Sequence, residues 1–259
     1  MSDTFFIDKT SNTFADALAA FGLADVLHQI LDRSGSSDGV RIIDEGPYYR
    51  LTCDVSIDNE IIEAASRWQD GSLLPFPGAP LIRTVKNAEK LPTDVPKTQD
   101  YLIDYEAERE RVNAYWEARR QLSADARRAD ARGQDHPELD LIRTLSSSVR
   151  NWDIYRAINP AGLIGYNSLM QQWWEARAVL PDLLRLLLDM TATTPNAIDT
   201  AEQRWKGLAK THNVNGSSQA TASQIFNPAQ GKGQNRAKAD RLDVPGRNVK
   251  NFWLMEWLK

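Results

Sequence analysis

Apolar residues recur at intervals of three or four positions near the N-terminus, which is the spacing of one face of an α-helix. These positions are Phe14, Leu18, Phe21, Leu27, Ile30 and Leu31. Asn12 or Thr13 can cap the first turn, and Asp16 supplies the negative charge that a helix N-terminus favours. The pattern predicts an N-terminal helix that ends before Gly35.

Two runs rich in β-branched and aromatic residues follow, between Val40 and Val55. The sequence Glu45–Gly46–Pro47 separates them and is typical of a hairpin turn. In the second run apolar side chains alternate with polar ones, so one strand face is expected to be buried. The apolar positions are Leu51, Cys53 and Val55. Asp58 is placed to cap a short helix that extends to Trp68, which completes a helix–hairpin–helix unit.

Prolines interrupt the chain after this unit. Residues 71–80 contain three prolines and two glycines, and no regular element can run through them, because proline lacks an N–H and fixes φ. A second cluster, Pro92 and Pro96, follows a short strand expected at residues 81–85. We therefore predict a small α/β domain over residues 1–90 and a mainly helical domain over residues 91–259.

The second domain is dominated by helical patterns. A long segment with mixed charge and a thin apolar stripe covers residues 100–133. Further helices are expected at residues 138–157, 161–179, 181–190 and 198–211. The apolar end of the chain, residues 251–259, is expected either to pack onto the core or to continue into a longer protein. The predicted fold class is α+β, predominantly α-helical, with an N-terminal helix–β-hairpin–helix followed by a helical body.

Composition agrees with a globular protein. Of 259 residues, 42% are hydrophobic and 25% are charged, which argues against a disordered chain, a fibre or a membrane bundle. No apolar run approaches the length of a membrane span, and no secretion signal is visible, so we expect no membrane partner. The single cysteine, Cys53, excludes an internal disulfide. Together these features favour a cytoplasmic location.

Catalytic patterns are absent from the sequence. His28, His136 and His212 lie far apart, and the chain contains no HExxH, CxxC or GxSxG motif. Cys53 lies on the apolar face of a predicted strand, where packing is a commoner role than catalysis. The Gly231–Gly233 sequence lacks the spacing of a P-loop. We therefore expect no enzyme activity, metal, cofactor or small-molecule substrate, and a metal-dependent nuclease has no motif to support it.

One segment is distinctly basic. Residues 227–250 hold six basic and two acidic residues, a charge of +4 in a chain of net charge −4, so the remainder carries −8. Gly231 and Gly233 would let backbone N–H groups approach a phosphate closely. The alternatives are a solvated basic loop or one paired with the acidic helices. The candidate nucleic-acid-binding residues are Asn227, Gln230, Lys232, Asn235, Arg236, Lys238, Arg241, Arg247 and Lys250.

Aromatic residues also lie beside basic ones, as at Arg204–Trp205–Lys206 and near Trp152. Exposed pairs of this kind form stacking platforms for single-stranded bases. Packing in the core is the favoured interpretation for both tryptophans. The other tryptophans in apolar helical contexts are expected in the core as well, namely Trp173, Trp174, Trp253 and Trp257.

The chain resembles a known family at two separated places. TFADALAAFGLADVL, at Thr13–Leu27, is similar to the opening of the large subunits of type I CRISPR surveillance (Cascade) complexes. An internal segment of some of these Cas8-like subunits resembles two stretches near the end of this chain. They are NPAQGKGQNRAKAD, at Asn227–Asp240, and FWLMEWLK, at Phe252–Lys259. The resemblance covers about forty residues, and such subunits are usually longer than this chain. It therefore suggests an N-terminal or compact form.

The resemblance implies a non-catalytic role in antiviral defence. Such a subunit contacts the 5′ handle of the guide RNA, inspects the motif that flanks the DNA target, and works among other subunits of the complex, while guide pairing reads the sequence. On this interpretation Lys232, Arg236, Lys238 and Arg241 contact phosphates. Asn227, Gln230 and Asn235 reach base edges. The alternative is a helical scaffold or interaction protein whose basic loop binds an acidic protein partner.

Overall fold

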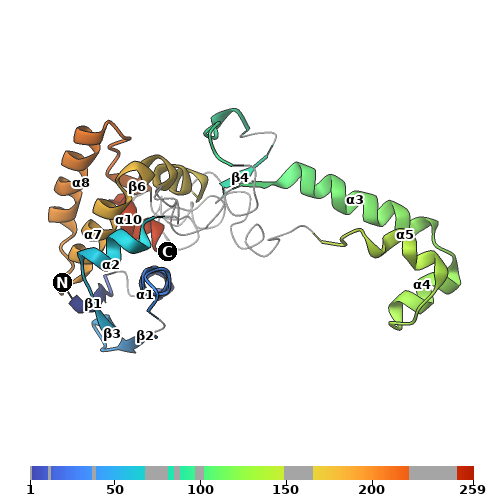
Figure 1. The fold of residues 1–259 in the computed structure, drawn as a ribbon, viewed down its shortest axis with the longest axis horizontal. Helices are drawn as coiled ribbons and strands as arrows, with labels where there is room; N and C mark the ends of the chain where they lie inside the picture. The colour runs from blue at the N-terminus through green and yellow to red at the C-terminus, as the bar shows by residue number, and fades with distance from the viewer. Residues whose placement is uncertain are drawn as a thin grey trace, which may run out of the picture. The chain divides into compact units, whose positions relative to one another are not determined.

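A computed structural model describes residues 2–10, 13–36, 39–67, 81–84, 88–96, 102–148, 166–221 and 250–259. The fold is α+β and predominantly helical, as the sequence predicts (Figure 1). The chain forms two compact units. Unit 1 combines Met1–Gly78 with Ile164–Lys259, and unit 2 is Ala79–Leu163. This division differs from the one near residue 90 that the proline clusters predict, because the two ends of the chain share one core.

A three-stranded antiparallel sheet forms one side of unit 1. Its strands are β1 (Ser2–Asp8), β2 (Val40–Asp44) and β3 (Tyr48–Ile57), in the order β1-β3-β2. The hairpin is confirmed, with Gly46 at φ 92° in its turn. Strand β1 was missed from the sequence, and it pairs with the free edge of β3, where Phe5 lies opposite Leu51.

Helix α1 (Phe14–Arg33) lies between β1 and β2 in the chain, and helix α2 (Asn59–Ala65) follows β3. Both helices have the N-terminal caps that the sequence predicts. The Thr13 hydroxyl accepts a hydrogen bond from the Ala15 N–H at 3.2 Å, and Asp58 accepts one from the Ile61 N–H at 2.9 Å.

The buried face of α1 differs from the predicted apolar stripe. Phe14 and Phe21 were assigned to the packed face, but they are 66% and 61% exposed. Small side chains such as Ala19 and Ala20 take their place in the core, beside Leu23. Among the described helices, α1 alone is long and apolar enough to cross a membrane by length and composition. Half of this apolar stretch is buried inside the fold, as in a core helix. A signal sequence near an N-terminus can have the same length and composition.

The C-terminal part of unit 1 is mainly helical. It comprises helical residues 166–176, a 3₁₀ turn at Arg177–Val179, α7 (Leu180–Thr191), α8 (Ile198–His212), β6 (Gln219–Thr221), β7 (Lys250–Phe252) and α10 (Trp253–Trp257). The apolar end packs into the core, where Trp253 and Leu254 are fully buried. The same core contains Phe5, Leu23 and Leu51 from the N-terminal part.

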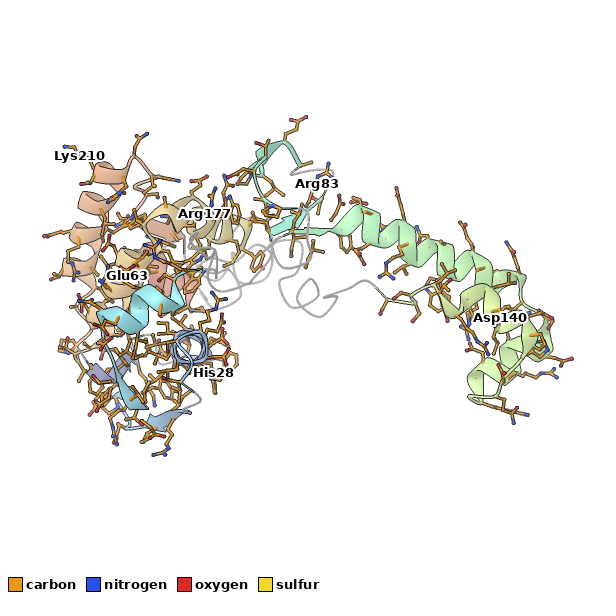
Figure 2. All side chains as sticks on the ribbon, in the orientation of Figure 1. His28, Glu63, Arg83, Asp140, Arg177 and Lys210 are labelled. Carbon is orange, nitrogen blue, oxygen red and sulfur yellow. The ribbon has the colours of Figure 1, made fainter. Side chains whose placement is uncertain are left out.

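An ion pair joins α2 to α7. The Arg185 guanidinium donates to Glu63 at 2.6 Å and to Asp182 at 2.9 Å, and Figure 2 labels Glu63. The hydrogen bond from Arg185 lowers the pKa of Glu63, so this pair stabilises the fold above the ordinary glutamate pKa. The stabilisation is lost as the pH falls through the lowered pKa of the folded state.

Replacing Glu63 with glutamine is therefore expected to lower the free energy of unfolding by about 0.2–1 kcal/mol at pH 7, the range of partly exposed pairs. Urea unfolding at pH 7 and at about pH 3 measures the difference, which should shrink at acid pH. Glu60→Gln, on the same helix, is the matched control, because Glu60 forms no ion pair with a described residue. An equal loss in both variants would contradict the role of the pair.

Unit 2 joins a parallel strand pair to a group of helices. Its elements are β4 (Leu81–Arg83), a 3₁₀ turn at Ala88–Lys90, β5 (Leu102–Asp104), α3 (Tyr105–Gln121), α4 (Ala124–Ala131), a 3₁₀ turn at Pro137–Leu139 and α5 (Asp140–Arg143). The long helix predicted over residues 100–133 is two helices, because Leu122 turns into a small core and Ser123 caps α4. That core also contains Ala126, Leu139 and Ile142.

Candidate nucleic-acid interface

Two short strands join the ends of the basic segment. Strands β6 and β7 pair antiparallel, with Thr221 opposite Lys250 and Gln219 opposite Phe252. Directly paired residues lie about 5 Å apart, so the 28 residues from 222 to 249 leave and re-enter the core at one place. The sequence did not predict this pairing, because small polar residues such as Ser217 and Ser218 precede β6 and are typical of a loop.

Most predicted binding residues fall within that segment. They lie outside the described residues and are Asn227, Gln230, Lys232, Asn235, Arg236, Lys238, Arg241 and Arg247. Lys250 is the first residue of β7, and only its backbone position is described. The structure therefore defines the base from which the basic segment extends, and the contacts of the segment stay predictions.

Hydrogen bonds fix the residues in front of β6. The Ser217 carbonyl accepts from the Trp205 indole N–H at 3.1 Å and from the Gln172 side chain. The Trp253 backbone N–H donates to the Ser218 carbonyl at 3.1 Å. The Ser218 hydroxyl donates to Glu202 on α8 at 2.8 Å. The base of the basic segment is thus tied to α8, to α10 and to the helix over residues 166–176.

A group of tryptophans supports this base. Trp173 stacks on Trp257 with ring centroids 3.9 Å apart, and Trp205 lies 5.2 Å from Trp253. Trp205 is fully buried, which confirms core packing and excludes a stacking platform at Arg204–Trp205–Lys206. The other tryptophans assigned to the core are buried too, and Trp152 lies outside the described residues.

Charged groups line the outer face of α8. Lys206 pairs with Glu202 at 2.8 Å, and the hydrogen bonds of Glu202 to Lys206 and Ser218 lower its pKa. Glu202 therefore stays ionised at neutral pH and holds Ser218 in place. Lys210, labelled at the end of α8 in Figure 2, forms no ion pair with any described residue and is exposed. This helix thus adds a free cation to unit 1.

The acidic excess of the chain is concentrated in one region. Residues 1–78 contain thirteen acidic and five basic residues, a charge of −8, whereas residues 79–163 contain fourteen of each. The hairpin acids are only partly neutralised, by pairs such as Arg50–Glu45 at 2.7 Å and Arg41–Asp54 at 3.3 Å. A phosphate backbone would be repelled there, and the positive charge of unit 1 is concentrated at residues 227–250.

Within the described ranges, no group of three or more His, Cys, Asp or Glu side chains could hold a metal ion. His28 is exposed on α1 (Figure 2), and His136 Nδ1 accepts from the Glu138 N–H at 3.3 Å. Cys53 is buried as expected, and burial raises the pKa of its thiol to about 11. Its reactive thiolate is therefore scarce at neutral pH.

No protein-family model matches the chain, and neither does a curated protein or a solved structure. The resemblance to CRISPR large subunits rests on the quoted segments. Thr13–Leu27 contributes the N-cap and the first part of α1, and Phe252–Lys259 covers the end of β7 and all of α10. Asn227–Asp240 lies outside the described residues.

Proposed function

We propose that this chain is a non-catalytic nucleic-acid-binding subunit of a type I CRISPR RNA-guided surveillance complex. In that role it contacts the 5′ handle of the guide RNA, the motif flanking the DNA target, or both. Its partners are the guide RNA, the target DNA and the other subunits of the complex. It acts in the cytoplasm without a cofactor.

The basic segment carries this proposal. Six cations and two acids lie within residues 227–250, and the β6–β7 pair brings Thr221, before this segment, beside Lys250 at its end. The segment therefore starts and finishes near one place on the fold, and its glycines suit close approach of the backbone to phosphates. Amide side chains such as Asn227 and Asn235 add donors and acceptors for base edges.

The position of the acidic residues supports the same function. A protein that bound phosphates over its whole surface would not carry −8 on residues 1–78. This charge distribution fits a protein that contacts only a short stretch of nucleic acid. It also fits a complex in which base pairing by the guide RNA, and not this protein, reads the target sequence. The acidic region is then available for contacts with basic surfaces of neighbouring subunits.

A scaffold is the second candidate. On that interpretation the basic segment binds an acidic protein partner, and the mixed-charge helices of unit 2 contact further proteins. The exposed Phe14 and Phe21 favour it, because aromatic side chains are enriched at protein interfaces. A scaffold should bind nucleic acid weakly at physiological salt and should bind a defined protein tightly.

Salt-dependent binding distinguishes the two candidates. We expect fluorescence anisotropy to show that wild-type protein binds single-stranded RNA, single-stranded DNA or duplex DNA with an affinity that falls as salt rises. Changing Lys232, Arg236, Lys238 and Arg241 to alanine should make the slope of log affinity against log salt shallower by about 3–4. Each lost phosphate contact removes about 0.7–0.9 from that slope.

The control variant removes four positive charges elsewhere. Arg41, Arg67, Arg128 and Arg143 each pair with an acid on the protein surface, so replacing them with alanine changes net charge equally without touching the segment or its base. The control is expected to keep a slope close to that of the wild type. If the four-alanine variant of the basic segment has the same slope as the wild type, the segment does not contact phosphates. That result would favour the scaffold.

A further inference from the structure

An exposed tryptophan lies on the long helix of unit 2. Trp116, on α3, is 42% exposed, one of the few large apolar side chains that the described surface presents. The Arg119 guanidinium lies 5.4 Å from its ring centroid, and Tyr115 meets it edge-on at 5.2 Å. These contacts orient the indole while leaving part of its surface open to solvent.

Two arginines flank this tryptophan along the helix. Arg109 precedes it by seven positions and Arg120 follows it by four, so all three lie on one face of α3. Both arginines are exposed, and neither forms an ion pair with any residue that the structure describes. By contrast, Arg111 pairs with Glu108 at 2.7 Å, and Arg119 pairs with Asp130 at 3.0 Å. The two free guanidinium groups are therefore available to a ligand.

Acidic residues border this face. Glu106, Glu110 and Glu117 lie about 80–120° around the helix from Trp116, at 100° per residue. Glu106 and Glu117 precede Arg109 and Arg120 by three positions, yet no described ion pair joins them. Glu108 lies on the opposite side of this face, where it pairs with Arg111 at 2.7 Å. An anionic strand would follow the stripe of Arg109, Trp116 and Arg120, while the glutamates would repel it from the neighbouring side.

We infer that this face of α3 is a stacking site for single-stranded nucleic acid. A base stacks on the open surface of Trp116, and the flanking phosphates bind Arg109 and Arg120. With a rise of 1.5 Å per residue, the two arginines lie about 16 Å apart along the helix, which suits a short stretch of strand. Unit 2 has equal numbers of acidic and basic residues, so this local arrangement, and not overall charge, provides the attraction.

The inference deepens the proposed function, on which its biological role rests, because it adds a stacking site separate from residues 227–250. Aromatic stacking is indifferent to base identity, since every base has a π-face. This face would therefore hold a single strand without reading its sequence. Arginine-rich faces with an exposed tryptophan also occur at protein interfaces, so the test must measure stacking itself.

The test compares a thymidine oligonucleotide with an abasic oligonucleotide of equal length, both fluorescein-labelled and bound to the full chain. We expect Trp116→Ala to weaken binding of the thymidine strand about fivefold or more, with little effect on the abasic strand. Trp116→Tyr, which keeps a ring, should retain most of the affinity. Arg109→Ala with Arg120→Ala should weaken binding of both strands, because phosphates are common to them.

Arg127→Ala with Arg132→Ala is the matched control. Both side chains are exposed elsewhere in unit 2, and neither pairs with a described acid. The control should bind both strands like the wild type, and all variants should melt within a few degrees of it. An unchanged affinity of Trp116→Ala for thymidine, equal losses on both strands, or equal losses in the two double-arginine variants would each overturn the inference.

Crosslinking locates the contact directly. A 5-iodouridine oligonucleotide irradiated with the wild-type chain should crosslink to the tryptic peptide of residues 112–119, which contains Tyr115 and Trp116. Absence of that peptide among the crosslinks would overturn the site. The titrations are then repeated in the four-alanine variant of residues 232–241. In that background the loss of affinity caused by Trp116→Ala is measured independently of the loss caused by the basic segment, so the two proposals can fail separately.

Discussion

Replacing Trp205 with alanine is expected to lower the free energy of unfolding by about 3–5 kcal/mol, the range for truncation of a buried aromatic side chain. Trp205 is fully buried, and its ring lies 5.2 Å from that of Trp253. Its indole N–H also donates to the Ser217 carbonyl, two residues before β6. The substitution therefore leaves a cavity and removes one hydrogen bond at the base of the basic segment.

Urea unfolding followed by circular dichroism measures this loss. Trp205→Phe is the informative companion, because it keeps a six-membered ring while it removes the rest of the indole together with the N–H donor. We expect it to cost far less, since the Gln172 side chain still donates to the Ser217 carbonyl. A loss below about 1 kcal/mol for Trp205→Ala would mean that the tryptophan group does not hold the C-terminal strands in place.

Gly22→Ala is the second large effect that we expect. A Cβ atom on Gly22 would lie 1.9 Å from the Leu258 carbonyl oxygen, so α1 and the end of the chain would have to separate. Alanine favours helix by up to about 1 kcal/mol over glycine, yet overpacking against backbone typically costs about 1–3 kcal/mol, and sometimes more. The net change should therefore be a destabilisation.

Gly207→Ala provides the matched control for that experiment. Gly207 lies inside α8, and a Cβ atom there would meet nothing within 4 Å. The same substitution should stabilise this helix by about 0.5–1 kcal/mol. Thermal or urea unfolding of both variants should show changes of opposite sign. A stable Gly22→Ala protein would show that α1 and Leu258 do not pack closely in solution.

Local signals in the sequence predicted local structure well. The Thr13 and Asp58 caps, the turn at Gly46 and the helix after Pro181 are all found where they were expected, because each depends on residues within a few positions. The buried tryptophans of the C-terminal part also followed from their apolar surroundings.

Features that depend on distant residues were missed. Strand β1 contains Phe5, Phe6 and Ile7 but no alternating pattern, and only its pairing with β3 makes it a strand. The β6–β7 pair joins residues on either side of a 28-residue segment, which no local pattern indicates. Phe21 fits the apolar spacing of α1, yet the helix packs through its alanine-rich face.

Prediction of the candidate site also failed where it depended on distant residues. The charge of residues 227–250 was evident from composition, whereas the position of their two ends depended on tertiary pairing. In α3 the sequence indicated a solvated helix of mixed charge, which was the simplest interpretation. That Arg109 and Arg120 form no described ion pair becomes informative only beside the ion pairs of Arg111 and Arg119.

The pairing of Thr221 with Lys250 makes residues 222–249 replaceable as a unit. Both ends leave the core side by side, and doubling the length of a flexible loop costs only about 0.6 kcal/mol in closure entropy. Insertions, deletions or a wholly different segment can therefore be exchanged between these strands while the tryptophan core stays unchanged. An engineer can therefore graft a new binding loop at this one junction.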